Sequence, residues 1–349
     1  MFKRASAPLI LVALLILVAG CGSAPGSAGP SASIPAGGPS PAGSPAELPT
    51  LTIQATIDGV NGPTVFVSTG DAIWVLEHSG ATLTRIDPAT NKVTARLALG
   101  SGFANGLGLA GGRLWTFEQT AGQVMAIDPT SAKLVATVKL GQDGDLFWVG
   151  DDAAWLLTSG TLARIDGTTA KVTTWPFDAT CTADGVAAGA GFVWVAAASG
   201  SLCKVDEKTG AVVARGSETG NGSGIAIVGG RPWIAGADDG LSIVEPGSLA
   251  VAVAVPAPPG GTSGGSTYSI GHPGGENTVV TGNADGKTGW VRYTGATIGR
   301  VNGGATPSIS LFAGLPGSTF AGGVTEAFGS LWVANFDGGT VQRYALPTP

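Results

Sequence analysis

The sequence predicts an all-β protein: a seven-bladed β-propeller of four-stranded blades, closed by an N-terminal strand that completes the last blade. Three observations predict this fold. An acidic turn motif recurs about every 40 residues, a tryptophan recurs with the same period, and apolar and polar residues alternate around each tryptophan. The chain has 349 residues, of which 58 are glycine and 12% are charged, which is enough for one large repeat domain.

The acidic motif first occurs as RIDPATNKV at residues 85–93. The acid returns at spacings of 41, 38, 40 and 39 residues, as Asp87, Asp128, Asp166, Asp206 and Glu245. A catalytic carboxylate is not needed five times, so the repetition indicates a structural unit. Aspartate followed closely by Thr and by Gly or Asn is typical of a turn, in which the carboxylate accepts backbone N–H bonds. We therefore expect these acids to fix the hairpin between the third and fourth strands of a blade.

The tryptophan repeat marks the second strand of each unit. Its members are Trp74, Trp115, Trp155, Trp194, Trp233 and Trp332, in segments such as AIWVL and FVWVA. One complete unit is expected to run through strands GVAAGA, FVWVAA, LCKVD and AVVARG, joined by short Gly-rich turns. Four short strands in about 40 residues are typical of a propeller blade.

The interval between Trp233 and Trp332 holds one further, degenerate blade. Residues 277–301 are expected to supply its second, third and fourth strands, with Val279 at the tryptophan position. The count is then seven blades, with extra loop around residues 256–276 and 303–321.

The two ends of the repeat region are expected to pair. The text TVQRYALPTP ends after a third strand, whereas LTIQATIDG at residues 51–59 is a fourth strand without a blade of its own. Pairing these two segments closes the ring and removes its exposed edges.

The N-terminus carries targeting features. Lys3 and Arg4 precede an apolar stretch at residues 7–18, as in a signal peptide, which we expect over residues 1–20. VAGC at residues 18–21 resembles the lipobox of bacterial lipoproteins, and this resemblance implies lipidation of Cys21; a plain signal peptide or an uncleaved anchor is the alternative. Residues 21–48 then form a lipidated Cys and a tether rich in Gly, Ser, Ala and Pro, and residues 49–349 the propeller.

Cleavage before Cys21 leaves 16 basic against 24 acidic residues, a net charge of −8. No basic stripe with interleaved aromatic residues is visible, which disfavours nucleic-acid binding. Of the three cysteines, Cys181 and Cys203 are expected to form a disulfide in an oxidising compartment, with free buried thiols as the alternative.

The pattern GxLWV followed by GxVxRIDPxTGKV resembles the bacterial seven-bladed propellers related to virginiamycin B lyase and to YVTN-repeat surface proteins. The likeness covers roughly residues 50–346. It implies the fold, whereas propellers of this kind serve many functions.

Counting ten residues back from each tryptophan position finds the expected start of the innermost strand. These positions are Thr64, Asn105, Asp145, Asp184, Ser223, Ser269 and Gly322. Six are polar and would ring one mouth of the central channel, and Asn105, Asp145, Asp184, Ser223 and Ser269 are the candidate ligand-binding residues. The alternative is that they turn the chain and bond neighbouring blades.

Only two histidines occur, His78 and His272. The resemblance to the lyases implies a histidine, a glutamate and a magnesium site on one face of the propeller. His272 and Glu276, in GHPGGEN, are the candidate catalytic pair; a plain surface loop is the alternative. His78 is expected in a turn between the second and third strands.

These observations favour a monomeric binding or scaffolding module, anchored by lipid to the extracytoplasmic face of the cell membrane and without a cofactor. Its partner would be a protein, a cell-wall component or a small molecule. The alternative function is a lyase of the virginiamycin B type, which would use Mg²⁺.

Overall fold

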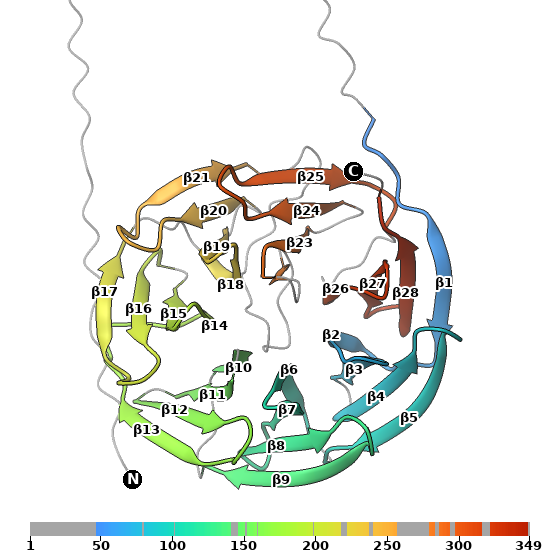
Figure 1. The fold of residues 1–349 in the computed structure, drawn as a ribbon, viewed down its shortest axis with the longest axis horizontal. Coiled ribbons are helices and arrows are strands. Elements are labelled where there is room, and N and C mark those ends of the chain that lie inside the picture. The colour runs from blue at the N-terminus through green and yellow to red at the C-terminus, as the bar shows by residue number, and fades with distance from the viewer. Residues whose placement is uncertain are drawn as a thin grey trace, which may run out of the picture. The chain divides into compact units, whose positions relative to one another are not determined.

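The computed structural model describes residues 47–347 except 79, 101, 141–145, 151, 159, 198, 218–221, 237–239, 257–278, 283–285, 294–296 and 316–321. In this part of the chain the regular elements are β-strands, arranged in seven antiparallel four-stranded sheets around a central axis (Figure 1). The predicted fold class, a seven-bladed propeller, is confirmed.

Each blade contributes one strand to each of four concentric rings. The first and innermost strands are β2 (Pro63–Ser68), β6 (Ala104–Ala110), β10 (Leu146–Gly150), β14 (Gly185–Gly189), β18 (Gly222–Val228), β22 (Val279–Gly282) and β26 (Val324–Ala327). The second strands are β3 (Ile73–Glu77), β7 (Arg113–Glu118), β11 (Ala153–Leu157), β15 (Phe192–Ala196), β19 (Arg231–Gly236), β23 (Thr288–Arg292) and β27 (Ser330–Asn335).

The third strands are β4 (Thr82–Asp87), β8 (Gln123–Asp128), β12 (Thr161–Asp166), β16 (Leu202–Asp206), β20 (Leu241–Val244), β24 (Ile298–Asn302) and β28 (Thr340–Ala345). The fourth and outermost strands are β5 (Lys92–Ala98), β9 (Lys133–Lys139), β13 (Val172–Pro176), β17 (Val212–Gly216), β21 (Val251–Val255), β25 (Ser308–Phe312) and β1 (Ile53–Asp58). Blades are numbered one to seven here, beginning with the β2–β5 sheet.

The hydrophobic core lies between the blades. Among the described residues, seven apolar clusters fill the seven gaps between neighbouring sheets. The tryptophan of each second strand packs toward the following blade: Trp74 contributes to the cluster with blade two, for example, and Trp332 to the cluster with blade one. Because both faces of the second strand are buried, its central residues are mostly apolar, as in the fully buried IWVLE of β3, where only the last residue, Glu77, is charged.

The acidic motif makes the predicted turn between the third and fourth strands. Asp87 accepts hydrogen bonds from the Ala89 N–H (2.8 Å) and the Thr90 hydroxyl (2.7 Å). Asp128, Asp166 and Asp206 bond the residues two and three positions further on in the same way. Glu245 differs: its carboxylate is ion-paired with Arg231 at 3.3 Å.

The residue four positions after each acid has a left-handed backbone. These residues are Asn91 (φ 57°), Ala132 (φ 53°), Ala170 (φ 59°), Gly210 (φ 66°) and Leu249 (φ 58°). Glycine and asparagine adopt this conformation most readily, and they occupy it in two of the five turns, whereas alanine or leucine does so in the other three.

The sixth blade corrects the sequence prediction. Val279 lies on the innermost strand β22, so residues 279–302 supply the first, second and third strands instead of the second, third and fourth. Trp290 on β23 takes the tryptophan position, opposite Arg300, as Trp155 lies opposite Arg164 in blade three. The fourth strand, β25, lies inside the 303–321 segment that was expected to be extra loop. The short apolar run at residues 279–280 resembled a second strand because both kinds of strand are apolar.

Closure of the ring by the N-terminal strand is confirmed. β1 pairs antiparallel with β28, with Ile57 opposite Val341, and forms the outermost strand of blade seven (Figure 1). The segment before β1 also forms hydrogen bonds with blade six. The Leu51 N–H donates to the Ala313 carbonyl at 2.9 Å, and the Ala313 N–H donates to the Pro49 carbonyl at 2.9 Å. The chain end thus bonds two neighbouring blades.

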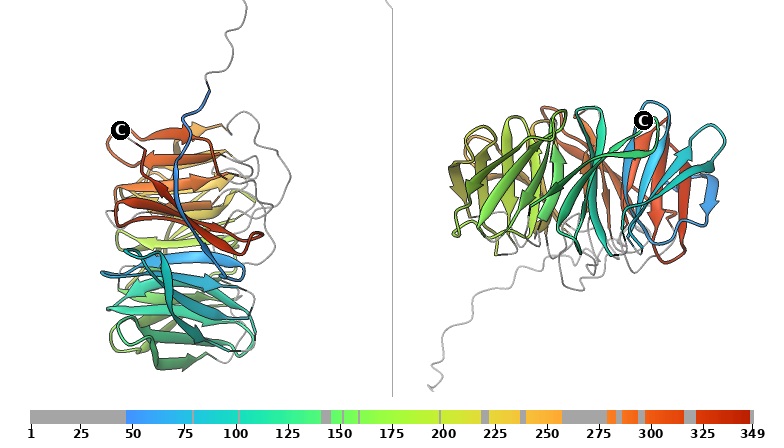
Figure 2. Two further views of the ribbon diagram at one scale, coloured as in Figure 1. Left: turned by 90° about the vertical axis from the view of Figure 1, so that its right-hand side faces the viewer. Right: turned by 90° about the horizontal axis from the view of Figure 1, so that it is seen from below.

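Seen edge-on, the strands of the propeller run from one flat face to the other (Figure 2). In every blade the first and third strands begin, and the second and fourth end, at one face, because all pairings within a blade are antiparallel. We call this the entry face; it carries the connections between blades, such as residues 177–184, and turns such as residues 78–81. The opposite face carries the turns between first and second strands, such as residues 328–329.

Candidate functional site

The candidate ring residues that the structure describes lie where the innermost strands begin, on the entry face. Asn105 and Ser223 are the second residues of β6 and β18, and Asp184 directly precedes β14. Asp145 and Ser269 lie outside the described residues. Ser269 was selected by counting from Val279; counted from Trp290, the equivalent residue of blade six is Val280 on β22.

Several ring positions bond to the protein itself. The Thr64 hydroxyl donates to the Leu76 carbonyl at 3.1 Å, and the Asn105 amide donates to Gln119 Oε1 at 2.8 Å. The Gly323 N–H, next to ring position Gly322, donates to the Thr64 carbonyl at 2.6 Å and so joins blades seven and one. The first two bonds lie within one blade and the third joins two blades. A ligand role for the ring stays a prediction.

A buried carboxylate network in blade one was not anticipated from the sequence. Glu77, the last residue of β3, is 3% exposed and accepts bonds from Arg96 Nη1 (2.6 Å), the Asn61 N–H (2.9 Å) and the Thr84 hydroxyl. One cation and two neutral donors therefore satisfy this buried carboxylate. The network fixes the end of the second strand at the entry face.

Glu118 occupies the same position in blade two and is 2% exposed. It accepts the Ala121 N–H at 2.7 Å. The signal in the sequence was an acid three residues after the tryptophan in both WVLE and WTFE, at the end of an otherwise apolar strand.

His78 lies in the turn after β3, as predicted. Its ring stacks on Phe103, with centroids 5.0 Å apart and planes inclined by 22°. Burial lowers the pKa of His78, against a smaller raising effect of a hydrogen bond with the Ala104 backbone, so the ring is neutral near pH 7. Phe103 is 52% exposed and presents an aromatic surface on the entry face.

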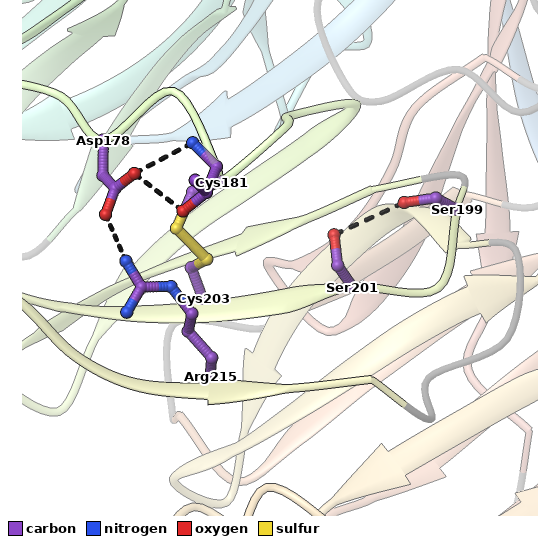
Figure 3. Close-up of a disulfide and its surroundings, with 7 residues drawn as sticks. Asp178, Cys181, Ser199, Ser201, Cys203 and Arg215 are labelled. Carbon is purple, nitrogen blue, oxygen red and sulfur yellow. Dashed lines mark hydrogen bonds and ion pairs between the residues drawn. A yellow bond between two sulfur atoms is a disulfide. The ribbon is translucent and has the colours of Figure 1, made fainter.

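The predicted disulfide between Cys181 and Cys203 is confirmed, with Cα atoms 6.0 Å apart (Figure 3). It ties the connection between β13 and β14 to β16. Asp178, the second residue of this connection, accepts the Thr180 N–H (2.9 Å) and hydroxyl (2.7 Å), and its other oxygen pairs with Arg215. These bonds, the Thr180 hydroxyl foremost, lower the pKa of Asp178, so the carboxylate is ionised at neutral pH.

A pocket of about 330 Å³ opens beside the disulfide on the entry face. Its walls come from β10, from the end of β11 and from the connection between β13 and β14 (residues 177–184), which we call the braced connection because the disulfide and Asp178 hold it. The lining residues are Leu146, Leu157, Thr158, Phe177, Ala179, Cys181, Thr182 and Ala183. The lining is mainly apolar with the Thr158 and Thr182 hydroxyls as polar groups, and the volume lies at the small end of the range for ligand pockets.

His272 and Glu276 lie outside the described residues, in the segment that joins β21 to β22. Among the residues that are described, no group of three or more His, Cys, Asp or Glu side chains is placed to hold a metal ion. Catalysis by this pair, with Mg²⁺, therefore stays a prediction. Cys21 and the tether also lie outside the described residues, and no helix in the described part of the chain is long and apolar enough to cross a membrane.

Comparisons with known proteins support the fold. No protein-family model matches the sequence, and no match was found among curated proteins. The structure is similar to the β-propeller domain of Cps50 (Swd1) from Myceliophteria thermophila, with a TM-score of 0.64, 14% identity and coverage of 85% of this chain and 100% of that one. It is also similar to BamB from Moraxella catarrhalis, with a TM-score of 0.58, 14% identity and the same coverages of 85% and 100%. At this identity the likeness shows the fold alone.

Proposed function

We propose that the protein is an extracytoplasmic, lipid-anchored β-propeller that binds a ligand or partner through its entry face. The observation that carries the proposal is the pocket beside the disulfide-braced connection of blades three and four, whose walls are held by Asp178, Arg215 and Cys203. A closed ring supports such a face because its seven blades form a rigid base for the connections between them.

Localisation is proposed on two independent grounds. A disulfide in a protein of this size is typical of secreted or periplasmic proteins. The VAGC motif and the Gly/Ser/Ala/Pro-rich segment after it are typical of a lipidated and tethered N-terminus. Cys21→Ser is expected to move the protein from the membrane fraction to the soluble extracytoplasmic fraction; a protein that stays with the membrane would contradict lipid anchoring at Cys21.

The binding face is tested with a pair of matched probes. Phe103 on the entry face is 52% exposed and Phe328 on the opposite face 37% exposed. Each is replaced separately by the photo-reactive analogue p-benzoylphenylalanine, and the full-length protein is irradiated in its native cells. A cross-linked species that recurs with the Phe103 probe and is missing with the Phe328 probe is expected. The same species from both probes, or capture only through Phe328, would contradict binding at the entry face.

A further inference from the structure

Arg292 breaks the pattern of the repeat. Two residues after the blade tryptophan, the other six blades carry buried apolar residues: Leu76, Phe117, Leu157, Ala196, Ala235 and Ala334. Blade six carries Arg292 instead, and the side chain is 1% exposed. The fold needs only an apolar residue here, so the guanidinium has no role in the packing shared by the blades.

The protein satisfies only one side of this guanidinium. Nη1 donates to the Gly322 carbonyl at 3.1 Å and to the Ala334 carbonyl, both in blade seven. Nε and Nη2 are also buried, and neither has a hydrogen-bond partner among the residues that the structure describes. Since the Nη1 bonds fix the orientation of the side chain, the free donors are the parallel N–H groups on the other edge of the guanidinium.

The charge is retained in this environment. Burial lowers the pKa of Arg292 to about 10, although Tyr344 and Asp337 act to raise it. The group therefore remains a cation at neutral pH. Two open donors on a buried cation are unfavourable, and an anion that accepts from both of them would stabilise the group.

The free edge has the geometry of an anion receptor. Parallel N–H groups of one guanidinium match the two oxygens of a carboxylate, which forms two charge-assisted bonds in one plane. A single guanidinium balances the single charge of a carboxylate. A phosphate dianion would need further hydrogen-bond donors. The groups bonded to Nη1, the Gly322 and Ala334 carbonyl oxygens, are acceptors and cannot supply them.

Arg292 lies at the entry-face end of its strand. It is the last residue of β23 and pairs with Val279, the first residue of β22. Its bond to Gly322 connects it to the ring position of blade seven. We propose that Arg292 is the anchor of a binding site for a carboxylate-bearing ligand at the junction of blades six and seven; the site rests on the proposed function only in that the entry face is taken as the binding face. Because Nε and Nη2 are enclosed, binding requires a local shift of the packing around them and is expected to be slow.

The test uses the purified full-length protein and measures its thermal unfolding at constant ionic strength. The probes are sodium acetate and N-acetylglycine, which represent a small organic acid and a peptide C-terminus, with acetamide and N-acetylglycinamide as their neutral counterparts. The two acids are expected to raise the melting temperature in a saturable way, and the amides and sodium phosphate are not. A larger effect of one acid identifies the source of the carboxylate.

Two substitutions assign the effect to the free edge. Arg292→Met is expected to abolish the acid-dependent shift while the melting temperature in chloride stays at least as high as that of the wild type. Arg292→Lys is expected to weaken acid binding by about tenfold or more, because one ammonium cannot present two parallel N–H groups. Arg300→Met, on the next strand and ion-paired with Glu326, is the control and should keep the shift.

No acid-dependent shift in the wild type, an equal shift with the amides or phosphate, or a shift that survives Arg292→Met would each overturn the proposal. Cross-linking through Phe103 is a separate measurement. An entry-face partner without an acid response contradicts only the carboxylate site, and the reverse result contradicts only the proposed function.

Discussion

At the residue scale, the repeat is maintained by seven buried tryptophans, one in each second strand, all at most 1% exposed. Several donate their indole N–H to the carbonyl five residues earlier, the last residue of the innermost strand; Trp115 bonds Ala110 at 3.1 Å and Trp332 bonds Ala327 at 3.0 Å. Trp290 instead bonds Glu326 of the next blade at 3.0 Å. Each indole thus fills the gap to the next blade, and those of Trp115, Trp233, Trp290 and Trp332 also donate a specific bond. In the described part of the chain the buried Nε1 atoms of Trp74 and Trp194 have no such partner.

Trp290 should therefore be as important to stability as the tryptophans of the regular blades. Trp290→Ala is expected to lower the free energy of unfolding by about 3–5 kcal/mol, since it removes a fully buried aromatic side chain. Urea unfolding measures the change, with Trp332→Ala as the comparison. The control is Val213→Ala, which is 53% exposed and should change stability by less than about 0.5 kcal/mol. A Trp290→Ala protein as stable as the wild type would disprove the blade-six register.

At the element scale, the turn between third and fourth strands depends on ionised aspartates. Hydrogen bonds within the turn lower the pKa of Asp87, Asp128, Asp166 and Asp206 from the usual 3.8. A group whose pKa is lower in the folded state contributes stability that is present above the unfolded pKa and is lost as the pH falls through the folded pKa. Because the pKa shift has the same direction at all four turns, their contributions to the pH dependence of stability have the same sign.

We therefore expect the melting temperature to be insensitive to these groups above about pH 5 and to fall steadily below about pH 4. Asp166→Asn removes one of the four contributions, so its melting temperature should fall less steeply with acid than that of the wild type. Scanning calorimetry between pH 3 and 7 measures both curves. Parallel curves for the two proteins would show that the Asp166 carboxylate does not stabilise its turn through ionisation.

The braced connection, held to β16 by the Cys181–Cys203 disulfide, is the second element whose contribution to stability can be tested. The disulfide closes a loop with a sequence separation of 22, and a loop of that length is expected to contribute on the order of 3 kcal/mol by restricting the unfolded chain. The double variant Cys181→Ala/Cys203→Ala should be less stable by about that amount, measured by urea unfolding without reductant. In dithiothreitol the wild type should approach the double variant, and the double variant should not change. A double variant of wild-type stability would contradict the expected contribution.

At the scale of the whole molecule, closure makes the two ends of the domain interdependent. β1 covers the outer edge of β28 and brings Ile57 and Val60 into the core between blades seven and one, where they are 4% and 0% exposed. Without β1 the edge of β28 has no partner and this core is opened, and an open edge is a template for aggregation.

Deletion of residues 49–60 is accordingly expected to give a protein that aggregates or melts at a much lower temperature. Size-exclusion chromatography with light scattering and a thermal melt measure the two effects. The matched control removes residues 22–46 and should melt as the wild type does. An unchanged melting temperature after loss of residues 49–60 would refute this role of the closure.

The sequence by itself determined the blade number, the turn chemistry, the disulfide pairing and the closing strand. Three of these depend on a local or periodic pattern: an Asp at the start of a turn, a tryptophan every 40 residues or so, and an unpaired strand at each end. The disulfide was predicted from the two cysteines that remain beside Cys21 and from the expected oxidising compartment. A repeat multiplies a weak local signal, which is why Asp87 and Trp74 could be interpreted together with their counterparts.

Only the tertiary structure decided the register of blade six, the buried network around Glu77, the pocket beside Cys181 and the free edge of Arg292. In blade six the periodic signal is interrupted, and an apolar run such as that at Val279 fits an innermost or a second strand equally well. The other three features arise from groups that are apart in sequence and meet only in the folded chain: Glu77 and Arg96 meet within blade one, whereas the Arg292 side chain and the Ala334 carbonyl meet where blades six and seven pack. The pattern along the chain predicts the strands of each regular blade, whereas the contacts between blades decide whether a polar group such as the Arg292 guanidinium finds hydrogen-bond partners.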